Sequence, residues 1–229
     1  MLDQLEIARR LAEVKERIAA AAKRASRTPD SICLVLASKT QPAEAVRAAY
    51  QAGARDFGEN YVQEAISKHR ELHDLHGARW HLIGHLQTNK ARQACSIFYL
   101  IHSLSSSRLA HALHRAHPAG KARVLIEVNL GGEASKHGIA PADVEALINS
   151  VRDTVDVAGL MAIPPPVSDP EESRPQFSRL RTMRDTLSAH CGLALKELSM
   201  GMTDDFEVAI EEGATIVRVG RAVFGERHQ

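Results

Sequence analysis

Hydrophobic positions along this chain follow two rhythms, one typical of helices and one typical of strands. Residues 3–24 carry apolar side chains three or four positions apart, the spacing of a helix with one buried face. These side chains are Ile7, Leu11, Val14 and Ile18. After the polar stretch SRTPD (26–30), short runs rich in β-branched residues alternate with longer helical stretches. The pattern therefore predicts one N-terminal helix followed by repeated strand–helix units.

The strand–helix alternation is regular enough to predict a fold class. The predicted strands are 32–38, 54–57, 79–83, 97–103, 122–129, 155–163, 195–199 and 214–220. The predicted helices between them are 43–52, 60–72, 88–95, 107–116, 141–151, 172–189 and 204–212. Such alternation within 229 residues favours an α/β protein with a (β/α)₈ TIM-type barrel. A doubly wound open sheet is the alternative, but the GxGxxG turn that often follows its first strand is absent.

No internal repeat, low-complexity segment or linker divides the chain. The proline-rich stretch IPPPVSDPEESRP (163–175) is interpreted as one long loop between a strand and the following helix. We therefore expect a single barrel domain over residues 1–229, with residues 1–28 forming a helix that packs on the barrel.

Composition narrows the partners and the compartment. With 29 basic and 28 acidic side chains the net charge is +1. The overall charge therefore does not favour binding to nucleic acid or to an anionic membrane. The three cysteines, Cys33, Cys95 and Cys191, lack CxxC spacing, which argues against a disulfide framework and for a reducing compartment. Charged residues interrupt the N-terminus, so no signal peptide is predicted, and no apolar run is long enough to span a bilayer. We expect a soluble, cytoplasmic protein.

Histidines are numerous, but their spacing does not indicate a metal site. Neither an HExxH motif nor a paired Cys/His ligand set is present, so no metal is predicted. His81 and His85 flank the end of a predicted strand and are interpreted as structural histidines. The GxSxG and Walker motifs are also absent.

In barrels of this kind the chemistry lies at the carboxyl ends of the strands. The polar or small residues at those ends are Lys39, Glu59, Asn60, Gly84, His85, His102, Ser103, Asn129, Pro164, Ser199 to Thr203, Arg218 and Gly220. These positions predict where a site lies, and by themselves they do not indicate a reaction.

Lys39 ends the apolar run LVLASK, and two interpretations of it are open. Lys39 alternates with Val35 and Ala37, so the three side chains should point to the same side of the strand. If that side faces the barrel, partial burial lowers the pKa of the amine and makes it a better nucleophile toward an aldehyde. A solvated lysine at the end of a strand explains the segment equally well.

Arg218 alternates with Ile216 and Gly220 in TIVRVG, which places a guanidinium among apolar neighbours. Burying a charge without a partner is costly, so Arg218 should meet an acid, a carbonyl or a ligand. Glu127, within the apolar run VLIEVN, is a candidate acid, and a structural salt bridge between the two is one hypothesis.

The stretch LSMGMTDDFEVAIEEGA (198–214) predicts a strand, a turn and a helix. Asp204 and Glu207 form a capping pair in this interpretation. A functional alternative is an anion site, since barrels often bind phosphate between their last two strand–helix loops. Its donors would be the main chain and hydroxyls of Ser199, Gly201, Met202 and Thr203.

Several blocks of the chain resemble the pyridoxal phosphate homeostasis proteins. The blocks are ASKTQP (37–42), FGENYVQE (57–64), WHLIGHLQTNK (80–90), IHSL (101–104), GLMAIPPP (159–166) and LSMGMTDDFEVAIEEGATIVRVGRAVFG (198–225). That family is similar to the barrel half of fold-type III enzymes such as alanine racemase. The resemblance implies pyridoxal 5′-phosphate (PLP) as cofactor, held as a Schiff base on a strand-end lysine without established turnover.

The resemblance also assigns roles to residues. Lys39 matches the lysine of the Schiff base, Asn60 a residue packed near the cofactor ring, and Arg218 the arginine near the pyridine nitrogen. Ser199, Met202, Thr203 and Gly220, with Gly201 in the same block, match the segments that hold the phosphate. A permanent charge at Arg218 keeps the ring nitrogen unprotonated, which weakens the ring as an electron sink.

Three functions follow from these residues. The first is a monomeric carrier that buffers PLP and supplies it to apo PLP-dependent enzymes. The second is a fold-type III amino-acid racemase or decarboxylase, although such enzymes add a large β domain that is not evident in this sequence. The third is a Schiff-base aldolase, which would leave the phosphate features and Arg218 coincidental. The carrier, with no catalytic turnover, is the prediction of the sequence.

Overall fold

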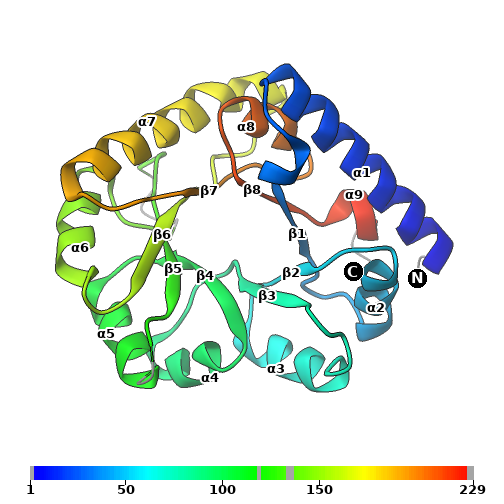
Figure 1. Cartoon of the computed structure of the whole chain (residues 1–229), viewed down its shortest axis with the longest axis horizontal. Coiled ribbons are helices and arrows are strands. Elements are labelled where there is room, and N and C mark those ends of the chain that lie inside the picture. Colours follow the sequence, from blue (N-terminus) through cyan, green and yellow to red (C-terminus); the bar gives the residue numbers. More distant parts are fainter. Residues whose placement is uncertain (1–2, 118–119, 133–136, 226–229) are drawn as a thin grey trace.

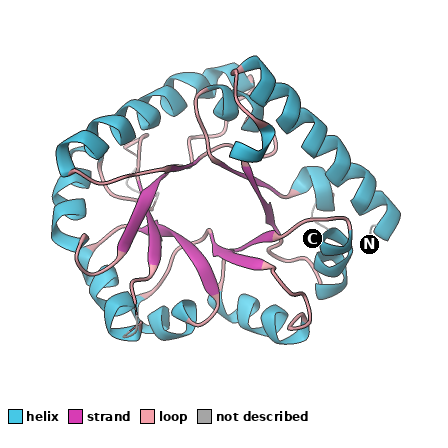
Figure 2. Cartoon of the chain, in the orientation of Figure 1, coloured by secondary structure: helices cyan, strands magenta, loops and turns pink. Residues whose placement is uncertain are grey.

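The computed structural model describes residues 3–117, 120–132 and 137–225. Eight parallel strands close into a barrel in chain order, and the helices form a ring around it (Figures 1 and 2). The strands are β1 (Cys33–Ala37), β2 (Asp56–Glu59), β3 (Arg79–Leu82), β4 (Phe98–Leu104), β5 (Arg123–Glu127), β6 (Asp156–Met161), β7 (Glu197–Ser199) and β8 (Ile216–Val219). The predicted barrel is confirmed, and all eight predicted strands are present.

The helices follow the predicted order with small shifts at their ends. They are α1 (Gln4–Arg24), α2 (Ala43–Gln51), α3 (Val62–Glu71), α4 (Ala91–Cys95), α5 (Ser107–Ala116), α6 (Val144–Val151), α7 (Arg174–Cys191), α8 (Phe206–Glu211) and α9 (Arg221–Phe224). Short 3₁₀ turns are η1 (Pro29–Ser31), η2 (Thr88–Lys90), η3 (Pro141–Asp143) and η4 (Pro170–Ser173). The one-turn helix α9 was not predicted, because four residues are too few to show a helical period. Within the described residues, no helix has the length and apolar character to cross a bilayer.

Helix α1 lies along the outside of the barrel beside α2, α8 and α9 (Figure 1). Asp3 starts the helix by accepting a hydrogen bond from the N–H of Glu6, and the apolar face predicted from the sequence is buried. Arg17 pairs with Glu207, which adds a polar contact to α8 at the edge of this interface. The proposed domain limits, 1–229, run beyond the described residues at both ends.

Apolar side chains fill two separate regions. The larger cluster lies between the strands and the ring of helices, and a smaller one lies inside the barrel. The inner cluster consists of Val35, Leu100, Leu125, Ala158, Met161 and Ile216. Buried polar side chains occupy further interior positions: Asp56, His81, His102, Ser199 and Arg218. The barrel interior is therefore partly a polar network, in contrast to the apolar layers usual in this fold.

Candidate functional site

Lys39 lies in a tight turn directly after β1, at the carboxyl end of the barrel. The Ser38 N–H donates to the Gly58 carbonyl on β2 at 2.9 Å, which continues the sheet to the start of the turn. Thr40 has a left-handed backbone with φ of 65°, an unfavourable conformation for a residue other than glycine. The Lys39 residue is partly buried. Val35, earlier on the same strand, faces the barrel interior, so the side of the strand that alternation assigns to Val35, Ala37 and Lys39 is the inner one at Val35.

Lys68 on α3 holds the main chain on both sides of Lys39. Its Nζ donates to the Ser38 carbonyl at 2.6 Å and to the Glu64 carboxylate at 2.7 Å. The same carboxylate oxygen of Glu64 accepts the Thr40 N–H at 2.6 Å. One lysine and one glutamate thus position the residues before and after Lys39, which compensates for the strain at Thr40.

Glu59 completes this cluster beneath the turn. Its carboxylate accepts Lys68 Nζ at 2.8 Å and the Ser38 hydroxyl at 2.7 Å, and its residue is fully buried. Burial raises the pKa of the Glu59 carboxyl, while Lys68 opposes that shift. Sequence reasoning assigned Glu59 to a strand end and missed Lys68. The available signal was the Glu64–Lys68 spacing, four residues apart on a predicted helix.

Two glycines let the main chain approach closely beside this turn. Gly220 follows β8, and a Cβ at this position would lie 3.0 Å from the Ala37 carbonyl oxygen, two residues before Lys39. Gly201 follows β7 with φ of 88°, and its Cβ would lie 2.5 Å from the Cβ of Ala209. The Gly201 carbonyl accepts the Arg218 N–H at 3.0 Å, so the loops after β7 and β8 adjoin.

The turn after β7 differs from the prediction in its capping. Helix α8 begins at Phe206, and Asp204 is outside it, ion-paired with Arg221. The Met202 N–H donates to Asp205 Oδ1 at 2.7 Å, so this amide is already satisfied. The predicted Asp204–Glu207 capping pair is wrong, because Asp205 closes the turn first and Glu207 faces α1.

Amides in these loops remain available to an anion. Within the described part of the chain, the N–H groups of Thr203, Asp204 and Gly220 meet no acceptor. Both aspartates have other partners, since Asp204 pairs with Arg221 and Asp205 binds Met202. The loops after β7 and β8 therefore present donors where the sequence predicted an anion site.

Arg218 reaches a hydroxyl and a carbonyl in the barrel interior. Its guanidinium donates to Ser199 Oγ at 2.5 Å and to the Ala162 carbonyl at 3.0 Å. The salt bridge hypothesised with Glu127 is not formed, and no residue in the described part of the chain hydrogen-bonds to the buried Glu127 Oε2. Burial lowers the pKa of Arg218 to about 10, and the nearby carboxylates of Asp205 and Glu127 oppose this shift. The guanidinium is charged at neutral pH.

A chain of hydrogen bonds continues from Ser199 through the barrel. His102 Nδ1 lies 2.9 Å from Ser199 Oγ, and His102 Nε2 lies 3.0 Å from His81 Nδ1. His81 Nε2 then lies 2.9 Å from Asp56 Oδ1. Arg218 can only donate, so the Ser199 hydroxyl accepts from it and can donate its own proton to His102 Nδ1. Neutral His102 then donates from Nε2 to His81 Nδ1, and neutral His81 donates from Nε2 to Asp56. The donor hydrogen of the Ser199 hydroxyl is then used inside the protein.

The pH dependence of stability tests whether His102 is neutral. Burial, with the positive charges nearby, holds the pKa of His102 well below its usual range. The unfolded chain binds this proton below pH about 6.5 and the folded chain does not, so stability falls as pH decreases from there. We expect His102→Gln to flatten this decline by up to about 1.4 kcal/mol per pH unit, measured by urea unfolding. Parallel pH profiles for the two proteins would contradict a neutral His102.

A cavity of about 520 Å³ opens at the carboxyl ends of β2, β3, β5 and β6. Of the residues predicted for the site, Asn60 lines it, together with Ile83 and Glu127. The main chain of Asn60 packs closely against Gly84, two residues after β3, where a Cβ would lie 2.4 Å from the Asn60 carbonyl oxygen. His85, on the rim, is exposed and stacks on His137 with ring centroids 4.5 Å apart.

The fold and this strand-end site define a barrel of the alanine racemase N-terminal domain class, whose family model matches residues 10–228. A pyridoxal phosphate homeostasis protein of Aquifex aeolicus is 47% identical over 222 residues, covering 95% of this chain and 97% of the relative. The protein of that name from Pseudomonas aeruginosa is 46% identical, covering 96% of each. The chain belongs to the pyridoxal phosphate homeostasis protein family.

Solved structures agree with this assignment. PipY of Synechococcus elongatus, determined with PLP bound, superposes with a TM-score of 0.85 at 41% identity, covering 96% of this chain and all of PipY. Alanine racemase of Corynebacterium glutamicum superposes with a TM-score of 0.76 at 18% identity, and 62% of its chain is covered. The second similarity concerns the fold alone.

Proposed function

We propose that this protein binds pyridoxal 5′-phosphate and maintains its supply, as the names of its relatives state for them. The observation that carries the proposal is the position of the Lys39 turn, anchored by Lys68 and adjoining the Gly220 loop. An amine and an anion cradle side by side match the two ends of a phosphorylated aldehyde. When bound, the cofactor supplies an aldehyde that condenses with an amine.

The residues of this chain divide the binding between them. Lys39 supplies the amine, and the amides of Thr203 and Gly220, which lack acceptors among the described residues, receive the phosphate. Gly201 supports that loop by permitting its left-handed turn. Asn60, at the cavity wall, packs near the ring. Met202 contributes through its side chain, which is 38% exposed, since its N–H is bound to Asp205.

Arg218 and Ser199 act together in this proposal. Arg218 presents its remaining N–H donors toward the ring nitrogen, and a fixed positive charge there disfavours protonation of that nitrogen. Ser199 and the Ala162 carbonyl orient the guanidinium. Ser199 therefore holds Arg218 in place, and the phosphate does not depend on its hydroxyl.

The requirement for the phosphate tests the anion cradle. We expect pyridoxal to bind at least about a hundredfold more weakly than PLP, because each charge-assisted hydrogen bond contributes about 1.5–3 kcal/mol. Visible absorption titrations of the two aldehydes measure the difference. Inorganic phosphate should compete with PLP and leave pyridoxal binding unchanged. Equal affinity for the two aldehydes would contradict the proposal that these loops bind the phosphate.

The proposal extends to release of the cofactor. A monomer in the cytoplasm that holds PLP reversibly can supply it to apo PLP-dependent enzymes, and we propose these as its partners. A mixture of loaded protein and an apo PLP enzyme should regain activity. Recovery at the rate of spontaneous PLP release indicates a reservoir, whereas faster recovery indicates direct transfer.

A further inference from the structure

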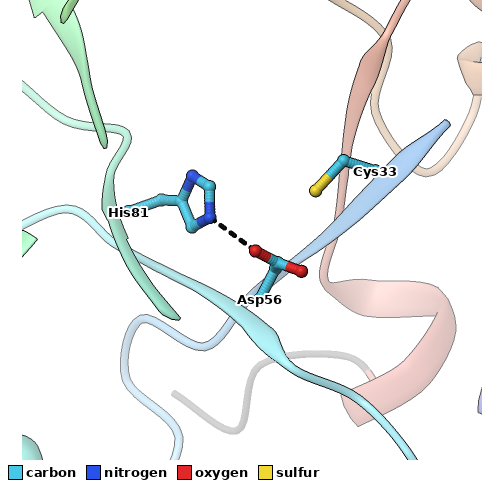
Figure 3. Close-up of side chains that lie close together, drawn as sticks. All are labelled: Cys33, Asp56 and His81. Atoms are coloured by element: carbon cyan, nitrogen blue, oxygen red, sulfur yellow. Dashed lines mark hydrogen bonds and ion pairs between the residues drawn. The ribbon is translucent and has the colours of Figure 1, made fainter. Parts of the chain in front are cut away.

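Three side chains of types that can ligate a metal lie close together (Figure 3). They belong to the strands whose other ends face the Lys39 turn. Cys33 and Asp56 are the first residues of β1 and β2, and His81 is the third residue of β3. A sulfur, a carboxylate oxygen and an imidazole nitrogen from these residues all lie within 4.8 Å of one another. We propose that Cys33, Asp56 and His81 form a binding site for a divalent cation, with Zn²⁺ as the ion that fits best.

The types of ligand atom determine which ion fits the site. Thiolate, imidazole and carboxylate together suit zinc, and three protein ligands leave the fourth tetrahedral position to water. Zinc bond lengths place neighbouring ligand atoms about 3.3–3.6 Å apart. The Asp56 Oδ1 to His81 Nε2 distance is 2.9 Å. Cys33 Sγ lies within 4.8 Å of one carboxylate oxygen of Asp56 and one ring nitrogen of His81. Side-chain shifts of about 1 Å complete the shell.

An outer partner already orients the histidine. His81 Nδ1 lies 3.0 Å from His102 Nε2, and both rings are buried. With zinc on Nε2, His81 carries its proton on Nδ1, and neutral His102 changes tautomer: its Nε2 accepts that proton and its Nδ1–H donates to Ser199 Oγ. A ligand histidine fixed in this way is typical of zinc sites, and such partners add to metal affinity.

Two features oppose binding of the ion and limit the affinity of the site for it. Arg79 donates to both Asp56 oxygens, at 2.8 and 2.7 Å, so its charge competes with the metal. Burial and the Asp56 carboxylate raise the pKa of the Cys33 thiol to about 12, so the metal must displace that proton. The Arg79 side chain is 47% exposed and can remain on Oδ2 or withdraw into water while Oδ1 binds zinc. Cys33 is partly exposed, which leaves the site accessible from this end.

Cobalt titration of the full-length, metal-free protein tests the site, because a thiolate ligand gives Co²⁺ a charge-transfer absorption band. We expect one Co²⁺ per chain, displaced by one Zn²⁺. Cys33→Ser should lose the band and weaken Zn²⁺ binding at least about tenfold. Cys95→Ser is the matched control, because Cys95 is also half-buried but outside the cluster, and it should bind like the unaltered protein.

Arg79→Gln provides a second, independent variant. Removing the competing guanidinium should tighten Zn²⁺ binding if Asp56 is a ligand, whereas a site elsewhere would not respond. The absence of a thiolate band, equal binding by Cys33→Ser, or the same loss in Cys95→Ser would each overturn the proposal. The measurement needs no PLP, so either result leaves the proposed function to its own tests.

Discussion

Lys39→Ala is expected to abolish the Schiff-base absorption band of the protein loaded with PLP. The reason is chemical: without the amine in the turn after β1, the aldehyde has no partner for condensation. The amides after β7 and β8 are unchanged by this substitution, so weaker, non-covalent binding of PLP should persist. Borohydride reduction followed by peptide mapping should label the peptide with Lys39 in the unaltered protein and label nothing in the variant.

Lys90→Ala is the matched control for this experiment. Lys90 belongs to η2 and lines the cavity that Asn60 also lines, so it offers an alternative amine at this end of the barrel. The control should keep both the absorption band and the borohydride label. A band that survives in Lys39→Ala, or a label found on Lys90, would show that the cofactor amine had been assigned to the wrong lysine.

Lys68→Met should lower the free energy of unfolding by about 3–5 kcal/mol. The substitution leaves the Glu59 carboxylate buried without its cation and leaves the Ser38 carbonyl without its donor. Breaking a buried pair from one side costs more than the pair itself contributes, because the remaining charge cannot be solvated. Urea unfolding at neutral pH measures the loss.

Two further variants show whether burial is the cause. Arg47→Met removes an ion pair with Asp74 on the exposed surface, and should shift the unfolding midpoint only slightly. Adding Glu59→Gln to Lys68→Met removes the unpaired charge and should recover part of the lost stability. If Lys68→Met lowers the free energy of unfolding by less than about 1 kcal/mol, the Lys68–Glu59 pair contributes no more than an exposed ion pair. Lys68 would then not stabilise the Lys39 turn as proposed.

The fold was predictable because each strand and helix carries its own periodicity. Alternation in LVLASK placed Val35 and Lys39 on one side of the strand, and the structure shows that Val35 faces the interior. Eight such runs with helices between them leave few topologies apart from a barrel. Boundaries were less accurate where a side chain competes with the helix, as at α8, where Asp205 binds Met202.

The interior partners were not predictable in the same way. Arg218 was expected to need a partner, and Glu127 was the candidate acid, yet the guanidinium reaches Ser199 and Ala162. His102 and Ser199 are 97 residues apart and belong to strands that are not neighbours in the barrel. Their contact depends on which inward side chains meet across the barrel, which is a property of the closed sheet.

The sequence by itself determined the barrel, the strand end that carries Lys39, and the family, because local periodicity and long matching blocks are written along the chain. The tertiary structure alone decided three features. It placed Lys68 beneath the Lys39 turn, joined Arg218 to Asp56 through Ser199 and two histidines, and brought Cys33 next to Asp56 and His81. Each depends on side chains far apart in sequence that meet only when the strands pair and the barrel closes, since strand alternation determines the face of a residue but not its partner.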